Sequence, residues 1–103
     1  MKYEIDSKDF RRRAGAASHF LRSLASRHRL MILCTLVEGE CAAGDLGRRL
    51  GLRPSNLSQH LAKLRQERLV ARRRVRTVIY YRLASERVEP ILSELYRLFC
   101  KKG

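Results

Sequence analysis

The sequence lacks the marks of a membrane protein and of a disulfide-stabilised secreted domain. Its longest apolar run, residues 30–37, is eight residues long and contains Thr35, whereas a membrane-spanning helix needs about 20. The first residues hold no apolar core of the kind that a signal peptide carries. Three cysteines, an odd number at wide spacing, make no disulfide framework. We therefore expect a protein of the reducing cytoplasm with no membrane partner.

Acidic residues are also scarce. The chain has 103 residues, of which 10 are acidic and 23 are Lys or Arg, and its formal net charge is +13. The sign of the charge excludes an acid-rich disordered segment, and an apolar content of 45% is enough for a folded core. The length allows a single domain over residues 1–103. Nucleic acid and an anionic membrane surface are the two partners that this charge suits.

Helical periodicity accounts for the first part of the chain. Apolar residues recur every three or four positions over residues 8–24, which predicts a helix there. Ser26 belongs to a residue type that caps helices, and the apolar residues after it predict a second helix to Val37. Gly39 then ends that helix.

Two closely spaced helices and a final one complete the helical part. The first of the two is short, near residues 43–50, and a glycine terminates it. The second begins at Pro54, which suits the first position of a helix. The final helix is expected within residues 86–102, starting around Glu86 or Pro90, and it carries a broad apolar stripe.

Between these helices the period changes to that of strands. Residues 70–83 are rich in Val, Ile, Tyr and Thr, and they fit two strands that turn near residues 74–76. That turn contains neither Gly nor Asn, the residues that short hairpins prefer. The predicted order is helix, helix, short helix, helix, hairpin, helix, a mainly α fold with a small β-hairpin (α+β).

The first and last helices look too apolar for a lone monomer of this size. An isologous pairing of two copies would bury both stripes against each other. We therefore expect a homodimer in which residues 8–24 and 86–102 are the dimerisation helices.

Positive charge concentrates between Arg48 and Arg76. This stretch holds ten basic residues and a single acidic residue, Glu67. It covers the longer of the two closely spaced helices and the hairpin after it. Residues 43–67, a short helix, a three-residue turn and a longer helix, resemble a helix-turn-helix.

The longer helix has an apolar inner side, formed by Leu57, Leu61 and Leu64, and a polar outer side. Short polar side chains and an amide can read base edges without filling the major groove. The predicted base-reading residues are Ser55, Asn56, Ser58, Gln59, His60 and Lys63.

Arginines of the hairpin suit phosphate contact or insertion into the minor groove. They are Arg72, Arg73, Arg74 and Arg76. Taken singly, any of these polar residues fits a merely solvated surface. Turn spacing, polar face and localised charge together favour double-stranded DNA as the partner. A membrane surface is disfavoured because no helix pairs a basic face with a broad aromatic one.

Three segments resemble the ArsR family of winged-helix repressors. Residues 20–33 (FLRSLASRHRLMIL) resemble its first helices, residues 54–65 (PSNLSQHLAKLR) its recognition helix, and residues 70–83, which end in IYYRL, its wing. The resemblance covers about residues 14–100. It implies a winged helix-turn-helix in the order α-α-α-α-β-β-α, and a homodimer that releases operator DNA when an inducer acts. The chain departs from the family at Arg68, where Gly is common, and at a wing tip without an acidic residue and Gly.

The sequence contexts of two cysteines indicate the chemical class of the inducer. The contexts of Cys41 (ECAAGDL) and Cys100 (LFC) resemble those of the sulfide- and persulfide-responsive (SqrR/BigR-like) subgroup. That resemblance implies that reactive sulfur species, persulfide or polysulfide, join the two sensing thiols through a polysulfide bridge and weaken DNA binding. Cys41 precedes a helix N-terminus, which favours thiolate, although Glu40 and Asp45 oppose it. Cys34 is expected to pack as a small apolar residue.

Other readings of the same sequence remain open. A metalloid or soft-metal responsive repressor would use Cys41 and Cys100, with or without Cys34, although such sites want several thiolates. A repressor without a cysteine-based inducer is a second alternative, and a thiol-switch enzyme, weakened by the missing C-x-x-C, is a third. The last helix has no His for a metal site, and no catalytic grouping or phosphate-binding loop is visible. We therefore expect no catalytic residue, no cofactor and no bound metal.

Overall fold

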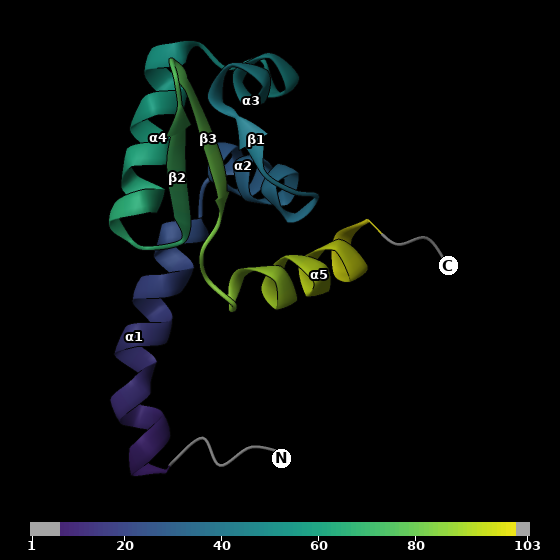
Figure 1. Ribbon diagram of the computed structural model, residues 1–103. Helices are drawn as coiled ribbons and strands as arrows, with labels where there is room; N and C mark the ends of the chain where they lie inside the picture. Colours follow the sequence, from purple (N-terminus) through teal and green to yellow (C-terminus); the bar gives the residue numbers. More distant parts are fainter. Residues whose placement is uncertain (1–6, 101–103) are drawn as a thin grey trace.

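A computed structural model describes residues 7–100 (Figure 1). Five α-helices and a three-stranded antiparallel sheet make up this part of the chain. In chain order the elements are α1 (Lys8–Leu24), α2 (Arg27–Val37), β1 (Cys41–Ala42), α3 (Ala43–Leu50), α4 (Pro54–Gln66), β2 (Val70–Val75), β3 (Val78–Leu83) and α5 (Val88–Phe99). The winged helix-turn-helix fold expected from the sequence is confirmed. No helix of residues 7–100 is long and apolar enough to cross a lipid bilayer.

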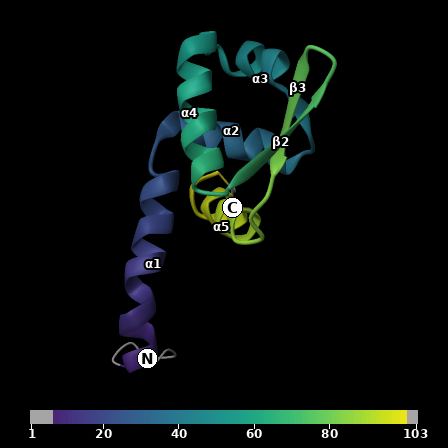
Figure 2. The ribbon, with the colours of Figure 1, turned by 60° about the vertical axis from the view of Figure 1, so that its left-hand side comes forward.

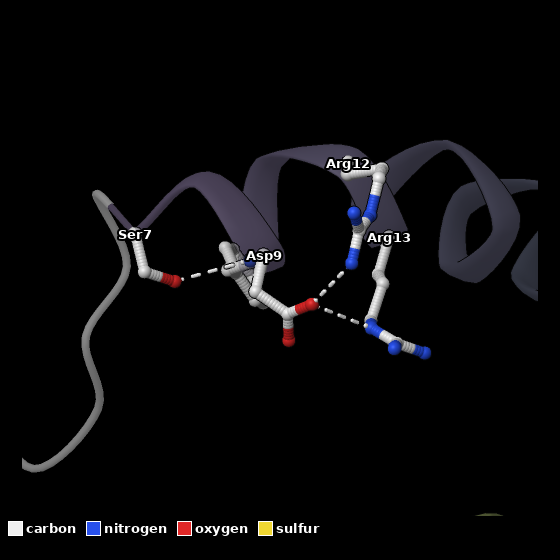
Figure 3. Close-up of polar contacts among 5 residues, drawn as sticks. Ser7, Asp9, Arg12 and Arg13 are labelled. Carbon is white, nitrogen blue, oxygen red and sulfur yellow. Dashed lines mark hydrogen bonds and ion pairs between the residues drawn. The ribbon is translucent and has the colours of Figure 1, made fainter.

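Side-chain caps start the first two helices. Ser7 Oγ accepts a hydrogen bond of 3.1 Å from the backbone of Phe10, and Asp9 in the first turn pairs with Arg12 and Arg13 (Figure 3). An acidic residue at this end also suits the helix dipole. Ser26 Oγ accepts in the same way from the backbone of Arg29, at 3.3 Å. Both helices therefore begin where local sequence chemistry favours a start.

The two helices of the helix-turn-helix meet through a tight turn. Gly51 ends α3 with φ +65°, a left-handed conformation that glycine adopts without a steric cost. Pro54 stands in the first turn of α4, where no backbone donor is needed. A Cβ at Gly47 would lie 3.3 Å from the backbone oxygen of Leu52 and 3.4 Å from Leu57. The glycine thus lets α3 and α4 approach closely.

A single apolar core lies between the helices and the sheet. Its fully buried side chains come from α2, α3, α4 and the start of α5: Ile32, Leu33, Leu46, Leu61, Leu64 and Val88. Of α1, only Ser23 and Leu24 are buried. The rest of α1 projects from the body of the molecule (Figure 1), and Figure 2 shows the same from another side.

The wing differs from the prediction in two details. β1 is a two-residue strand that the sequence did not reveal, and it pairs with β3 so that the sheet order is β1-β3-β2. The hairpin closes on the pair Val75–Val78, so the turn lies at Arg76 and Thr77 and not at residues 74–76. Arg76 adopts φ +58° there, the left-handed conformation that Gly or Asn would take more easily.

The last helix begins between the two starts expected for it. α5 begins at Val88, and Ser85 Oγ accepts from the backbone of Arg87 just before it. Pro90 falls in its first turn, where the missing donor costs nothing. The described part of α5 ends at Phe99, and the end of the expected range, residues 101–102, lies outside the described residues.

Candidate DNA interface and thiol pocket

Helix α4 presents the polar face expected of a recognition helix. Its inner leucines, Leu57, Leu61 and Leu64, are buried in the core. Most of the predicted base-reading side chains are exposed on the rest of the helix: Ser55, Asn56, Ser58, Gln59 and Lys63. The packing of the leucines therefore decides which side chains of α4 are free for a partner.

His60 differs from the other predicted base readers because α2 holds it. Arg29 Nε donates to His60 Nδ1 at 3.4 Å, and the His28 ring lies 5.5 Å away, centre to centre. Burial lowers the pKa of His60, and the nearby Arg29 and His28 lower it further. With Nδ1 accepting, the neutral ring keeps its proton on Nε2, which leaves that atom as a hydrogen-bond donor.

The wing arginines divide between the two faces of the sheet. Arg72 stands opposite Tyr81 and Arg74 opposite Ile79, whereas Arg73 stands opposite Tyr80 on the other face. Arg72, Arg74 and Arg76 are exposed and form no ion pair within residues 7–100. Their positive charges are thus uncompensated locally and available to phosphates.

Arg73 already has an intramolecular partner. Its guanidinium makes two hydrogen bonds of 2.8 Å to the Glu40 carboxylate, and it lies 5.0 Å from the centre of the Tyr80 ring. This pairing holds the pKa of Glu40 below its usual range. The contact ties β2 to the segment before β1, so Arg73 braces the wing, a role that its place in a run of arginines did not reveal.

A groove separates the wing from the helix-turn-helix. It has a volume of about 570 Å³, an apolar floor that includes Leu57, Ile79 and Tyr81, and arginines around it. Those arginines are Arg48, Arg53 and Arg72, from α3, the turn and β2 respectively. The charge count of the sequence included Arg48 and Arg53, but they were not among the predicted contact residues.

Cys41 and Cys100 were expected to act together, but the structure gives Cys100 a different neighbour. Cys41 lies in β1, is 8% exposed, and its Sγ donates to the backbone oxygen of Ala42. Its strand pairs with β3, which holds Cys41 opposite Tyr81 within the core. Cys100 is exposed at the end of α5. Cys41 is not among the residues that line the pocket beside Cys100.

Cys34 is the thiol that shares a pocket with Cys100. The pocket, of about 290 Å³, is lined by Cys34, Cys100 and the apolar side chains Leu30, Leu92, Leu95, Tyr96 and Phe99. Cys34 was expected to be packed away as a small apolar residue, but it is exposed, because it lies on the side of α2 that turns away from the core. The Cys34 thiol is nevertheless partly desolvated, which raises its pKa, and the nearby Cys100 raises the pKa further.

Comparison with known proteins places this geometry in a family. Residues 26–72, from α2 into β2, match the family described as "Bacterial regulatory protein, arsR family". The chain is 38% identical over 93 residues to the biofilm growth-associated repressor of Xylella fastidiosa, covering 90% of this chain and 82% of that protein. The chain belongs to the arsR family. It is accordingly a DNA-binding transcriptional regulator and not an enzyme.

Solved structures of similar proteins have the same architecture. The repressor BigR from Xylella fastidiosa superposes with a TM-score of 0.87 at 37% identity, covering 92% of this chain and 97% of that chain. Reduced HlyU from Vibrio cholerae superposes with a TM-score of 0.85 at 37% identity, covering 92% of this chain and 100% of that chain. The HlyU sequence is described as a transcriptional activator, so the relatives include both directions of control.

Residues 7–100 contain no group of three or more His, Cys, Asp or Glu side chains arranged to hold a metal ion. The three histidines lie on α1, α2 and α4, away from the cysteine pocket.

Proposed function

We propose that this arsR-family protein is a cytoplasmic homodimeric repressor that releases operator DNA when persulfide or polysulfide reacts with a pair of thiols. The pair is Cys100 with Cys34, in place of the Cys41–Cys100 pair that the sequence pointed to. The observation that carries the proposal is the common pocket of Cys34 and Cys100 at the contact of α2 and α5. Similarity to repressors supports the direction of control.

Contact with DNA is assigned to α4 and the wing. The exposed side chains of α4 are Ser55, Asn56, Ser58, Gln59 and Lys63, with His60 offering Nε2–H, and the wing contributes Arg72, Arg74 and Arg76. Small polar groups on α4 suit base edges, and the wing guanidinium groups suit phosphates. Arg73 supports this surface by holding the wing to Glu40.

A homodimer through α1 and α5 follows from the apolar side chains that these helices leave exposed. Phe10 and Leu21 on α1 and Leu98 and Phe99 on α5 are all more than half exposed, and Phe99 reaches 82%. A second copy that covers these faces removes them from water. The arrangement would place the thiol pocket close to the dimer interface, because Phe99 belongs to both.

The sensing step is a thiol exchange. The exposed Cys100 thiolate attacks the outer sulfur of a persulfide RSSH, forming Cys100–S–SH and releasing RS⁻. Cys34, converted to its persulfide in the same way, attacks the Cys100 sulfur through its terminal sulfur and expels HS⁻, which leaves a trisulfide bridge. The bridge ties α2 to the end of α5, and α2 also packs on α4. A shift of α2 against α5 would therefore be transmitted to the DNA-reading helix.

The test measures the release of fluorescent operator DNA by glutathione persulfide from single Cys→Ser variants. Cys34→Ser and Cys100→Ser are expected to bind DNA as the wild type does but to stay bound after treatment. Cys41→Ser is the matched control and is expected to release normally. Normal release from both Cys34→Ser and Cys100→Ser contradicts a dithiol mechanism, and failure of Cys41→Ser alone returns the role to Cys41.

The same assay separates the metalloid alternative. Two neighbouring thiols also suit trivalent arsenic, so arsenite is added in a parallel arm. Release by arsenite with arsenic retained on alkylation-protected thiols, and none by persulfide, would assign the protein to the metalloid-responsive regulators.

A further inference from the structure

Glu67 stands out in the most basic part of the chain. It is the single acidic residue between Arg48 and Arg76, and it caps the C-terminal end of the recognition helix α4. Its side chain is only 18% exposed. A partly buried carboxylate at the negative end of a helix dipole is unfavourable unless a donor or a positive charge compensates it.

His19 supplies that compensation from another helix. His19 Nε2 lies 2.6 Å from Oε1 and 2.8 Å from Oε2 of Glu67, although the two residues are 48 positions apart. Because an ionised carboxylate only accepts hydrogen bonds, Nε2 carries the proton and donates. His19 belongs to α1, so the contact links the proposed dimerisation helix to the recognition helix.

The base of α1 also meets the body of the protein, because Phe20 packs against the core and lines a pocket with the start of α5. The helix buries only Ser23 and Leu24, which lie at its C-terminal end. Figure 1 and Figure 2 both place this end of α1 beside the C-terminal end of α4, with the rest of α1 extending away. His19 lies one turn before the buried residues, where a bond to α4 restrains the angle at which α1 leaves the body.

We propose that His19 and Glu67 are positioning residues that set the angle between α1 and α4, and thereby the distance between the two recognition helices of a dimer on DNA. The inference rests on the dimer through α1 and α5 proposed above. A helix of 17 residues is roughly 25 Å long, so a tilt of about 10° moves its far end by roughly 4 Å. That is more than the rise of one base pair, about 3.4 Å.

The contact between His19 and Glu67 would restrict the spacing of the operator half-sites that the dimer binds. A dimeric helix-turn-helix protein binds half-sites whose separation matches that of its recognition helices. With the pair intact, the dimer accepts one spacing. Without it, only Phe20, Ser23 and Leu24 hold the base of α1, so its angle varies. Affinity for the correct spacing then falls, and altered spacings are discriminated less.

The experiment compares Glu67→Gln, His19→Gln and the double variant with Asp9→Asn. Asp9→Asn is the matched control because it also neutralises one carboxylate on or beside α1, but its pairs with Arg12 and Arg13 stay within α1. The operator is a duplex selected by the wild-type protein from random sequences. Binding is measured by fluorescence anisotropy on this duplex, on versions with one or two base pairs inserted between the half-sites, and on a scrambled duplex.

Each single variant is expected to lose about threefold to tenfold in operator affinity. The double variant should lose no more than either single one, since both remove the same contact. As base pairs are inserted between the half-sites, the affinity of the variants should fall less steeply than that of the wild type. Their affinity for the scrambled duplex and the sedimentation mass of the dimer should be unchanged. Asp9→Asn should behave as the wild type.

Wild-type spacing preference in both single variants would overturn the inference, as would additive losses in the double variant. Equal losses on operator and scrambled duplex would overturn it too, and a monomeric variant would assign the pair to assembly and not to spacing. A wild-type protein that selects no duplex contradicts the proposed function itself, so the two failures are distinguishable.

Discussion

At the scale of single residues, two non-glycine positions within residues 7–100 adopt left-handed backbone conformations. Arg68, at the turn from α4 to β2, has φ +61°, and Arg76 in the wing turn has φ +58°. Such a conformation costs roughly 1–2 kcal/mol for a residue with a Cβ. Arg68 is the position where the family resemblance led us to expect Gly, and the backbone gives the physical reason for that preference.

Arg68→Gly is therefore expected to stabilise the protein. Relief of the left-handed strain, less the greater flexibility of glycine in the unfolded chain, leaves a gain of about 0.5–1 kcal/mol. Thermal unfolding followed by circular dichroism should show a higher midpoint. Gly51→Ala, which introduces a Cβ at φ +65°, should lower it. A lower unfolding midpoint for Arg68→Gly would mean that the arginine side chain stabilises the protein by more than its left-handed backbone conformation costs.

Paired and unpaired wing arginines should affect the salt dependence of DNA binding differently. Arg76→Ala removes an uncompensated charge and should reduce the slope of log K against log salt by about 0.9 if the residue contacts one phosphate. Arg73→Ala should reduce the slope less, because Glu40 already compensates that charge. Affinities of both variants at several salt concentrations provide the comparison. Equal reductions would place Arg73 on DNA as well.

The lowered pKa of His60 leads us to expect that the protein becomes less stable in acid. Its pKa lies below the unfolded value of 6.5, through burial first and then through Arg29 and His28. The unfolded chain therefore binds the proton more readily, and the stability that His60 contributes is complete above that value. It is lost as the pH falls through the unfolded pKa toward the folded one. Thermal midpoints across this range should fall less for His60→Gln than for the wild type, and identical slopes would exclude His60 as the cause.

At the scale of elements, local chemistry made the helices predictable. Ser26, Gly51 and Pro54 act at helix ends as their residue types suggest, and the leucines of α4 face the core. The strand β1 was not predictable because two residues carry no period, and only pairing with β3 makes them a strand. The pocket shared by Cys34 and Cys100 depends likewise on how α5 packs against α2, and no local pattern contains that information.

Contacts between residues far apart in the sequence were likewise not predictable at the candidate DNA interface. The exposed face of α4 followed from the spacing of its leucines. The engagement of Arg73 by Glu40 and of His60 by Arg29 did not, since each partner lies more than 30 positions away. Long-range contacts thus decide which of the predicted DNA-contacting residues already have a partner within the protein.

At the scale of the whole molecule, the apolar side chains that α1 and α5 leave exposed lead us to expect a dimer, and the proposed operator binding depends on that dimer. Leu21 is 54% exposed on α1. Leu21→Asp should give a monomer in sedimentation equilibrium and weaken operator binding strongly, because two half-sites are no longer bound together. Its helical signal should stay near that of the wild type. A dimeric Leu21→Asp protein would move the interface away from this face of α1.

Peptide mass spectrometry of the persulfide-treated protein shows whether Cys34 and Cys100 form the sensing pair. Reduced protein is exposed to glutathione persulfide, digested and searched for cross-linked peptides, with peroxide as the parallel treatment. We expect a peptide that joins Cys34 to Cys100 and carries added sulfur mass after persulfide but not after peroxide. A cross-link from Cys41 to Cys100, with Cys34 unmodified, would rule out Cys34 as the partner of Cys100.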